Sequence, residues 1–136
     1  MINGLALVCL RVPDHQQALD FYVGKLGFEV NTDVQHDGFR YLVINAPRQP
    51  EVPIMLVVPG PPVMDEDTAA TVKSMIATGL YSVGALATDD CRASYAELKA
   101  KGVEFTEEPE ERFYGVDASF RDPFGNHWRL TQRKTP

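Results

Sequence analysis

One sequence pattern occurs twice, and it limits the folds that the chain can adopt. In each copy an apolar run leads to an aspartate, a helical pattern and a glycine, and the segments 14–27 and 89–102 have the same length. The residues around each glycine also correspond, because 26–30 and 101–105 both place a glycine before an apolar–acidic–apolar triplet. A repeated supersecondary unit is the economical interpretation.

The first copy predicts one strand, one helix and three further strands. The apolar run 5–12 is typical of a strand, and Asp14 can cap a helix over 15–26, where apolar residues recur at helical spacing. The remaining strands are expected at 28–30, 39–44 and 53–58, with a turn at 36–38. The first half is therefore expected to be a βαβββ module.

The second half repeats this order after a linker. Residues 59–80 form the expected linker, which carries an amphipathic helix over 65–77. Asp89 or Asp90 can cap the next helix, over 93–101. Strands are expected at 81–88, after Gly102, at 114–120 and at 127–131, and the acidic segment 107–112 is expected to be a solvated loop. The prediction is a single α+β domain over 1–136, with modules at 1–58 and 81–136.

The end of the second module combines a turn with an alternating strand. In the segment 122–125 Pro123 fixes its own φ, while Gly125 or Asn126 can take a positive φ. The alternation that follows places Trp128 and Leu130 on one face of a strand, and so places His127 and Arg129 on the other. What His127 and Arg129 face is the functional question.

Composition excludes several classes of partner. The net charge is −6, from 13 basic and 19 acidic residues, and the basic residues form no run, so nucleic acid is not expected as a partner. No apolar stretch is long enough to span a membrane, and no membrane association is expected. Cys9 and Cys91 form no CxxC pair, which indicates reduced thiols and a cytoplasmic protein.

Four short motifs connect this pattern to a known family. They are Val-Pro-Asp at 12–14, Ala-Leu-Asp-Phe-Tyr at 18–22, Leu-Gly-Phe at 26–28 and Asp-Pro-Phe-Gly-Asn at 122–126. With two βαβββ modules they resemble the vicinal oxygen chelate superfamily, which contains glyoxalase I, extradiol dioxygenases, fosfomycin-modifying enzymes and bleomycin resistance proteins. The resemblance implies curled mixed sheets with helices on the outside, each sheet forming a cup that holds a metal or a small molecule. It also implies a homodimer.

The resemblance further implies four metal-ligand positions, which this chain fills with other residues. They correspond to Leu7, to Val83, to Arg129 and to one apolar residue in the run from Ile54 to Val58. Neither aliphatic side chains nor a guanidinium cation binds a divalent metal. We therefore expect no cofactor; the alternative is a relocated divalent metal held by His127 with a carboxylate such as Asp117.

The expected cup is then lined by apolar groups and a few polar ones. The candidate ligand-binding residues are Arg129, His127, Cys9, Arg11, Arg40, Tyr114 and Asp117. The arginines could clamp an anion by bidentate hydrogen bonds, or each could pair with an internal acid such as Asp117 or Glu104. Cys9 could face the cup, or be an inert buried thiol. The segment 107–112 would instead favour a cationic ligand if it formed the rim.

Three functions follow from these alternatives. The first is a metal-independent protein that binds or sequesters a small, partly aromatic molecule, such as an antibiotic, in a cup at a dimer interface. The second is a lyase, isomerase or dioxygenase that uses a relocated metal or acid–base residues such as His127, Cys9 and Tyr114. The third is an interaction module whose cup is filled by its own side chains. The sequence favours the first.

Overall fold

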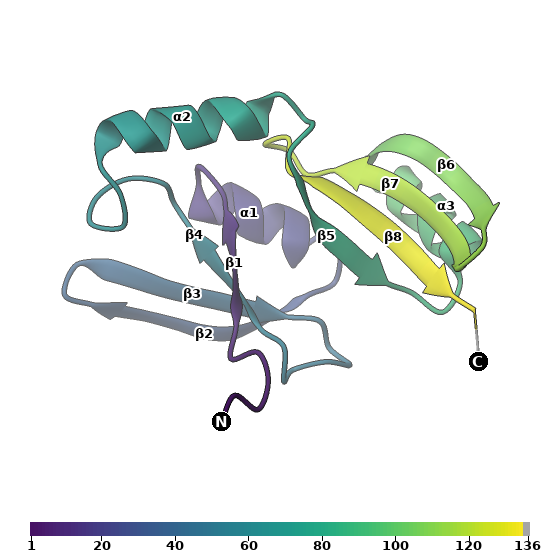
Figure 1. Cartoon of the computed structure of the whole chain (residues 1–136), viewed down its shortest axis with the longest axis horizontal. Helices are drawn as coiled ribbons and strands as arrows, with labels where there is room; N and C mark the ends of the chain where they lie inside the picture. The colour runs from purple at the N-terminus through teal and green to yellow at the C-terminus, as the bar shows by residue number, and fades with distance from the viewer. Residues whose placement is uncertain (135–136) are drawn as a thin grey trace. The chain divides into compact units, whose positions relative to one another are not determined.

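Two compact units make up the chain in a computed structural model that describes residues 1–134. The units are Met1–Lys73 and Ser74–Pro136, and the boundary between them lies inside helix α2 (Glu66–Ala77). Each unit contains a four-stranded mixed sheet and a helix that packs on it (Figure 1). No helix within the described residues has both the length and the hydropathy to cross a lipid bilayer.

The first unit has the predicted βαβββ order. It consists of β1 (Val8–Arg11), α1 (His15–Tyr22), β2 (Glu29–His36), β3 (Phe39–Asn45) and β4 (Ile54–Val57), in the sheet order β1-β4-β3-β2. Strand β1 is parallel to β4, and the other neighbours are antiparallel. Asp14 caps α1 as expected, because its carboxylate accepts a 2.7 Å hydrogen bond from the Gln17 amide.

Helix α1 covers one face of this first sheet. It buries Ala18, Phe21 and Tyr22, and the Phe21 and Tyr22 rings meet edge to face with centroids 5.0 Å apart. His15 ties the start of the helix to the sheet, since its Nε2 lies 2.9 Å from the Leu56 carbonyl oxygen. Burying these aromatic side chains contributes to the hydrophobic core of the unit, together with buried strand residues such as Leu42, Ile44 and Leu56.

The second unit repeats the order of the first. It consists of β5 (Ser82–Ala87), α3 (Cys91–Ala100), β6 (Glu104–Arg112), β7 (Gly115–Arg121) and β8 (His127–Arg133), in the sheet order β5-β8-β7-β6. Of the two candidate caps, Asp90 caps α3, and its carboxylate accepts a 3.0 Å hydrogen bond from the Ala93 amide. The predicted α+β fold with two βαβββ modules is confirmed.

One expected loop is instead a strand. Residues 107–112 belong to β6, which pairs with β7 along its whole length but contains two bulges, between Phe105 and Glu107 and between Glu107 and Glu110. The prediction was wrong because acidic residues and Pro109 normally interrupt a strand. Since β6 is an edge strand, its unpaired side tolerates a proline and its charges remain in water.

The turn before β8 is held by one carboxylate. Oδ1 of the buried Asp122 accepts hydrogen bonds from the amides of Phe124, Gly125 and Asn126, and Oδ2 accepts one from the Asn126 side chain. Gly125 takes the positive φ that the sequence allowed, at 110°. A side chain there would also collide with the carbonyl oxygen of Ile76 at the end of α2. The turn therefore sets the start of β8.

The two faces of β7 and β8 differ as the alternation predicted. Phe120, Trp128 and Leu130 are buried on the face that packs against α3, while His127 and Arg129 lie on the opposite face. We call this opposite face of β6, β7 and β8 the open face.

Candidate functional site

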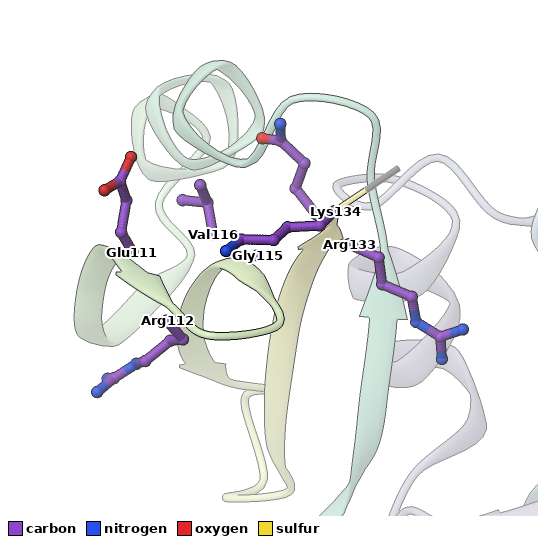
Figure 2. A pocket seen from close by; sticks show the side chains of 7 residues that line it. Glu111, Arg112, Gly115, Val116, Arg133 and Lys134 are labelled. Carbon is purple, nitrogen blue, oxygen red and sulfur yellow. The ribbon is translucent and has the colours of Figure 1, made fainter. Parts of the chain in front are cut away.

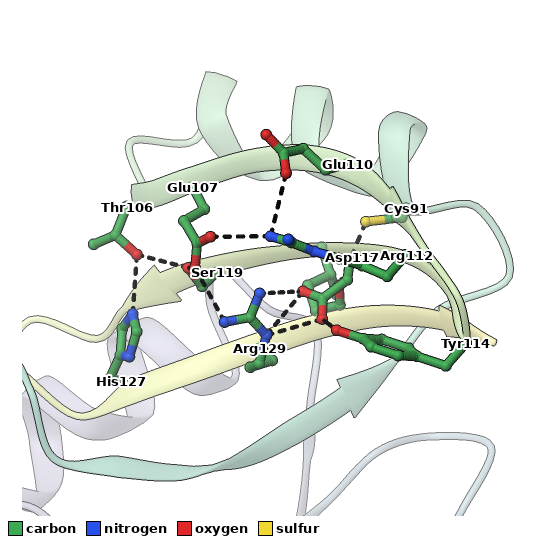
Figure 3. A network of polar contacts seen from close by, with 11 residues as sticks. Cys91, Thr106, Glu107, Glu110, Arg112, Tyr114, Asp117, Ser119, His127 and Arg129 are labelled. Atoms are coloured by element: carbon green, nitrogen blue, oxygen red, sulfur yellow. Dashed lines mark hydrogen bonds and ion pairs between the residues drawn. The ribbon is translucent and has the colours of Figure 1, made fainter.

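An ion pair lies at the centre of the open face. The Arg129 guanidinium binds both oxygens of Asp117, with Nη2–Oδ1 at 2.7 Å and Nε at 2.9 Å from each oxygen (Figure 3). Asp117 is 1% exposed, whereas the Arg129 side chain is 33% exposed. Burial alone would raise the pKa of Asp117, but the hydrogen bonds from Arg129 and Tyr114 outweigh it and the pKa is lowered. Asp117 is therefore ionised at neutral pH.

Glu107 of β6 is the second carboxylate bound to Arg129. Its Oε1 lies 3.0 Å from Arg129 Nη1 and also accepts a 2.9 Å hydrogen bond from the Ser119 hydroxyl. These two contacts, Ser119 first, lower the pKa of Glu107. Arg112 completes the cluster, with its Nη2 at 3.2 Å from Glu107 and 3.3 Å from Glu110. The charge of Arg129 is thus offset from two sides, while its own pKa is raised.

Tyr114 extends the cluster toward the turn between β6 and β7. Its hydroxyl donates a short hydrogen bond to Asp117, and this bond raises the pKa of the Tyr114 phenol. The neighbouring Phe113 is 89% exposed and meets the Tyr114 ring edge to face, with centroids 5.1 Å apart. Two exposed aromatic rings therefore lie beside the ion pair, and one of them is fixed by a buried carboxylate.

His127 lies at the other end of the open face. Its Nε2 is 2.9 Å from the Thr106 hydroxyl, which is in turn 2.8 Å from the Ser119 hydroxyl. Burial, followed by the charges of Arg121 and Arg129, lowers the pKa of His127. A line of side chains therefore connects His127 through Ser119 to Arg129, Asp117 and Tyr114 (Figure 3).

The other three candidate residues belong to the first unit. Arg40 forms a bidentate pair with Asp33, with both hydrogen bonds at 2.9 Å, and Arg11 is half-buried on β1. Cys9 is exposed, so the expectation of a buried thiol there was wrong: it lies on the β1 face that α1 does not cover. The structure brings together Arg129, His127, Tyr114 and Asp117, but it does not place them relative to the candidates on the first unit.

The family's metal positions do not fit a metal here. Leu7 and Val83 carry no ligand atom, and the side chains of β4 (Ile54–Val57) are all apolar. The positively charged guanidinium of Arg129 lies between two carboxylates.

The structure corrects the C-terminal boundary of the run from Ile54 to Val58, in which one metal position was expected. The sequence placed Val58 at the end of the fourth strand, but β4 ends at Val57 and Val58 lies one position beyond it. The difference has a physical reason, because the pairing of β1 with β4 stops at Arg11 and Val57, and Pro59 and Gly60 then turn the chain away. The candidate position therefore narrows to the four residues of β4, and Val58 would in any case bring no ligand atom.

The described residues offer no substitute for these ligands. Within residues 1–134 there is no group of three histidine, cysteine, aspartate or glutamate side chains arranged to hold a metal ion. A metal placed at Arg129 would have to displace a guanidinium from a buried carboxylate, which is costly.

The sequence did not identify Thr106, Glu107, Arg112 or Ser119 as part of this cluster. Glu107 and Arg112 were assigned to a loop, and the bulges hide the alternation that would have placed them on the open face. Ser119 could have been found from the strand register, because it is the β7 residue that pairs with Arg129 on β8. The alternative in which each arginine pairs with an internal acid named Asp117 and Glu104: Arg129 pairs with Asp117, whereas Glu104 pairs with Arg121 at 3.4 Å.

A small hollow lies on the second sheet, beside the turn between β6 and β7 and the end of β8. It has a volume of about 270 Å³, and its lining residues are Glu111, Arg112, Gly115, Val116, Gln132, Arg133 and Lys134. In Figure 2 the Lys134 side chain extends across Gly115, and the Arg112 and Arg133 side chains point outward. It is smaller than most ligand pockets and has no aromatic wall, so we assign it no role.

Comparisons with known proteins agree with this geometry. The family model described as "Glyoxalase/Bleomycin resistance protein/Dioxygenase superfamily" matches residues 4–130. A protein of Bacillus subtilis (strain 168), the uncharacterized YurT, is 30% identical over 131 residues, which are 95% of this chain and 98% of YurT.

Solved structures show the same relationship. The crystal structure of UcmS2 is 39% identical, with a TM-score of 0.92 over 97% of this chain and 99% of UcmS2. TnmS3, described as an antibiotic binding protein from Streptomyces sp. CB03234, is 29% identical, with a TM-score of 0.77 over 98% of each chain. From the fold, the repeated module and the match over residues 4–130, this chain belongs to the glyoxalase/bleomycin resistance protein/dioxygenase superfamily.

Proposed function

We propose that this chain is a metal-independent binding protein that sequesters a small, partly aromatic molecule of the antibiotic type. The observation that carries the proposal is the state of Arg129, which stands at a family metal position and is bound by the buried Asp117 and by Glu107. A position that in metal-dependent relatives supplies a ligand is here part of an internal ion pair. The family's scaffold is retained while its metal-assisted chemistry loses its ligands.

The same cluster supports binding over catalysis. Asp117 and Glu107 already accept hydrogen bonds from Arg129, and the Tyr114 hydroxyl already donates one to Asp117. A general base needs a pKa near the working pH, but the pKa of both carboxylates is lowered and that of Tyr114 is raised. The alternative was a lyase, isomerase or dioxygenase with acid–base residues such as His127, Cys9 and Tyr114, and the raised pKa disfavours Tyr114 in that role.

The ligand is expected to be planar and not anionic. Tyr114 and Phe113 offer exposed aromatic rings beside the cluster, and such rings stack on planar molecules. Arg129 and Arg40 could clamp an anion only by giving up their carboxylate partners. The description of TnmS3 as an antibiotic binding protein supports an antibiotic-like compound as the ligand.

We further propose that the two units act as one domain and that the binding cup forms at a homodimer interface. Strand β5 supports this, because it is an edge strand without a charged residue, and such edges invite pairing with another chain. The two free thiols, Cys9 and Cys91, are consistent with the reducing environment of the cytoplasm.

Thermal-shift screening tests the proposed function. The purified protein is heated with a library of aromatic antibiotics and aromatic acids, with and without a chelator, since a ligand of the native state raises the melting temperature. We expect neutral aromatic antibiotics to raise it equally with and without chelator, and mass spectrometry to recover each ligand unchanged. Recovery of a chemically altered compound would instead establish an enzyme.

A further inference from the structure

A chain of hydrogen bonds runs from His127 through Thr106 and Ser119 to Glu107, and the donor and acceptor of each bond can be assigned. Glu107 is an ionised carboxylate and can only accept, so the Ser119 hydroxyl must donate its single proton to it across 2.9 Å. Ser119 is then the acceptor in its 2.8 Å contact with Thr106, so the Thr106 hydroxyl donates its single proton to Ser119.

This direction determines the tautomer of His127. Because the Thr106 proton is already used, Thr106 can only accept in its 2.9 Å contact with His127 Nε2. Nε2 must therefore carry a proton, and in a neutral imidazole the second nitrogen, Nδ1, is then an unprotonated acceptor. The structure gives Nδ1 no hydrogen-bond partner within residues 1–134, and the half-buried ring lies on the open face.

We propose that His127 Nδ1 is the hydrogen-bond acceptor that selects the ligand, and that the ligand presents an uncharged O–H or N–H donor, such as a phenol, next to an aromatic ring. This inference deepens the proposed function and rests on it. His127 acts as a specificity determinant: it accepts a hydrogen bond from the ligand and transfers no proton. The line through Thr106, Ser119 and Glu107 is the positioning element that keeps Nδ1 available.

Burial and the charges around the ring keep it neutral at physiological pH. Burial, followed by the positive charges of Arg121 on β7 and Arg129 on β8, lowers the pKa of His127 below its ordinary 6.5, and Glu107 on β6 opposes this shift. On the side of β5, the backbone amide of His127 donates a 3.0 Å hydrogen bond to the carbonyl oxygen of Tyr81. Acid would protonate Nδ1 and turn it from acceptor to donor, so binding of a phenol should be lost as the pH falls through this lowered pKa.

Nitrogen NMR of the histidine rings tests the tautomer without any ligand. At pH 7.5 we expect His127 in the Nε2–H form, and Ser119→Ala should mix the tautomers because it frees the Thr106 proton to point at Nε2. Ser94→Ala is the matched control, since Ser94 forms a similar 2.6 Å hydroxyl pair with Thr88 on the same unit. An Nδ1–H signal for His127 in the unmodified protein would overturn the proposal, as would a tautomer unaffected by Ser119→Ala and Thr106→Val.

A pair of probes tests the ligand class. We expect 2-naphthol to shift the Nδ1 resonance of His127, while 2-methoxynaphthalene, which has no donor, leaves it in place. His127→Phe keeps a planar ring without either nitrogen, so it removes the Nδ1 acceptor and should weaken 2-naphthol binding about tenfold while leaving 2-methoxynaphthalene binding unchanged. If Nδ1 responds to both probes or to neither, the acceptor role is wrong. That outcome is distinct from failure of the proposed function, in which no antibiotic raises the melting temperature.

Discussion

The ion pair between Arg129 and Asp117 should respond asymmetrically to the loss of either partner. Asp117 is 1% exposed, whereas the Arg129 side chain is 33% exposed and also contacts Glu107. Arg129→Met leaves a buried carboxylate with Tyr114 as its remaining side-chain donor, while Asp117→Asn leaves a guanidinium that keeps Glu107 and reaches water. We therefore expect the arginine variant to be the less stable of the two.

The size of the difference follows from the cost of an uncompensated buried charge. Removing one partner of a buried pair costs about 3–5 kcal/mol, which we expect for Arg129→Met. For Asp117→Asn we expect about 1–2 kcal/mol, because the remaining charge is partly solvated and retains a carboxylate. With a urea m-value of about 2 kcal/mol/M, the unfolding midpoint should fall by about 1.5–2.5 M for Arg129→Met and by about 0.5–1 M for Asp117→Asn.

The difference should also depend on pH. In the unmodified protein the pKa of Asp117 is lowered, so its contribution to stability is present above its ordinary 3.8 and is lost as the pH falls through the lower folded value. Without Arg129, burial dominates and should raise that pKa, so the carboxyl group can protonate before the protein unfolds. The stability gap between Arg129→Met and the unmodified protein should narrow from pH 7 to pH 4.

Urea unfolding followed by circular dichroism measures these differences. Arg40→Met is the control, because Arg40 and Asp33 form a bidentate pair of similar geometry with side chains 30% and 39% exposed. We expect that control to leave the midpoint almost unchanged. The reasoning is refuted if Arg129→Met costs no more than Asp117→Asn, or if Arg40→Met costs as much as Arg129→Met.

Three further predictions concern the scaffold. Gly115→Ala should disrupt the pairing of β7 with β8, since its Cβ would lie 1.9 Å from the Gln132 carbonyl oxygen on β8, whereas Gly38→Ala, in open space at φ 76°, should cost about 1–2 kcal/mol; thermal melts that fall equally would contradict this. Asp122→Ala removes the acceptor of three backbone amides and should lower the free energy of unfolding by about 2–4 kcal/mol, measured in urea; a change under about 0.5 kcal/mol would mean that the turn holds itself. Sedimentation velocity at micromolar concentration should show a dimer, and a strict monomer would count against a cup at a dimer interface.

The fold could be predicted from the sequence because its signals are local and repeated. An aspartate caps each module's helix, Asp14 in the first and Asp90 in the second, and a glycine follows each helical segment, although α1 ends at Tyr22, before Gly27. The alternation of Trp128 and Leu130 with His127 and Arg129 gave the faces of β8, because side chains alternate in any regular strand.

The sequence named Asp117 as a possible partner of Arg129, but the partners that β6 supplies could not be predicted, because bulges decide them. The two bulges of β6 bring Glu107 beside Ser119 and Arg129 and leave Glu104 beside Arg121. A bulge adds a residue without a strong sequence signal when it lies in an exposed edge strand. The network of Thr106, Ser119 and His127 depends on that register, so only the structure identified it.

Isothermal titration with metal-stripped protein tests the central claim most directly. The protein is treated with a chelator, its metal content is checked by mass spectrometry, and an antibiotic identified by thermal shift is titrated before and after zinc, iron, nickel or manganese is added. We predict the same affinity in every titration and recovery of the ligand unchanged. Binding that requires one of these metals at a stoichiometric level would contradict the account.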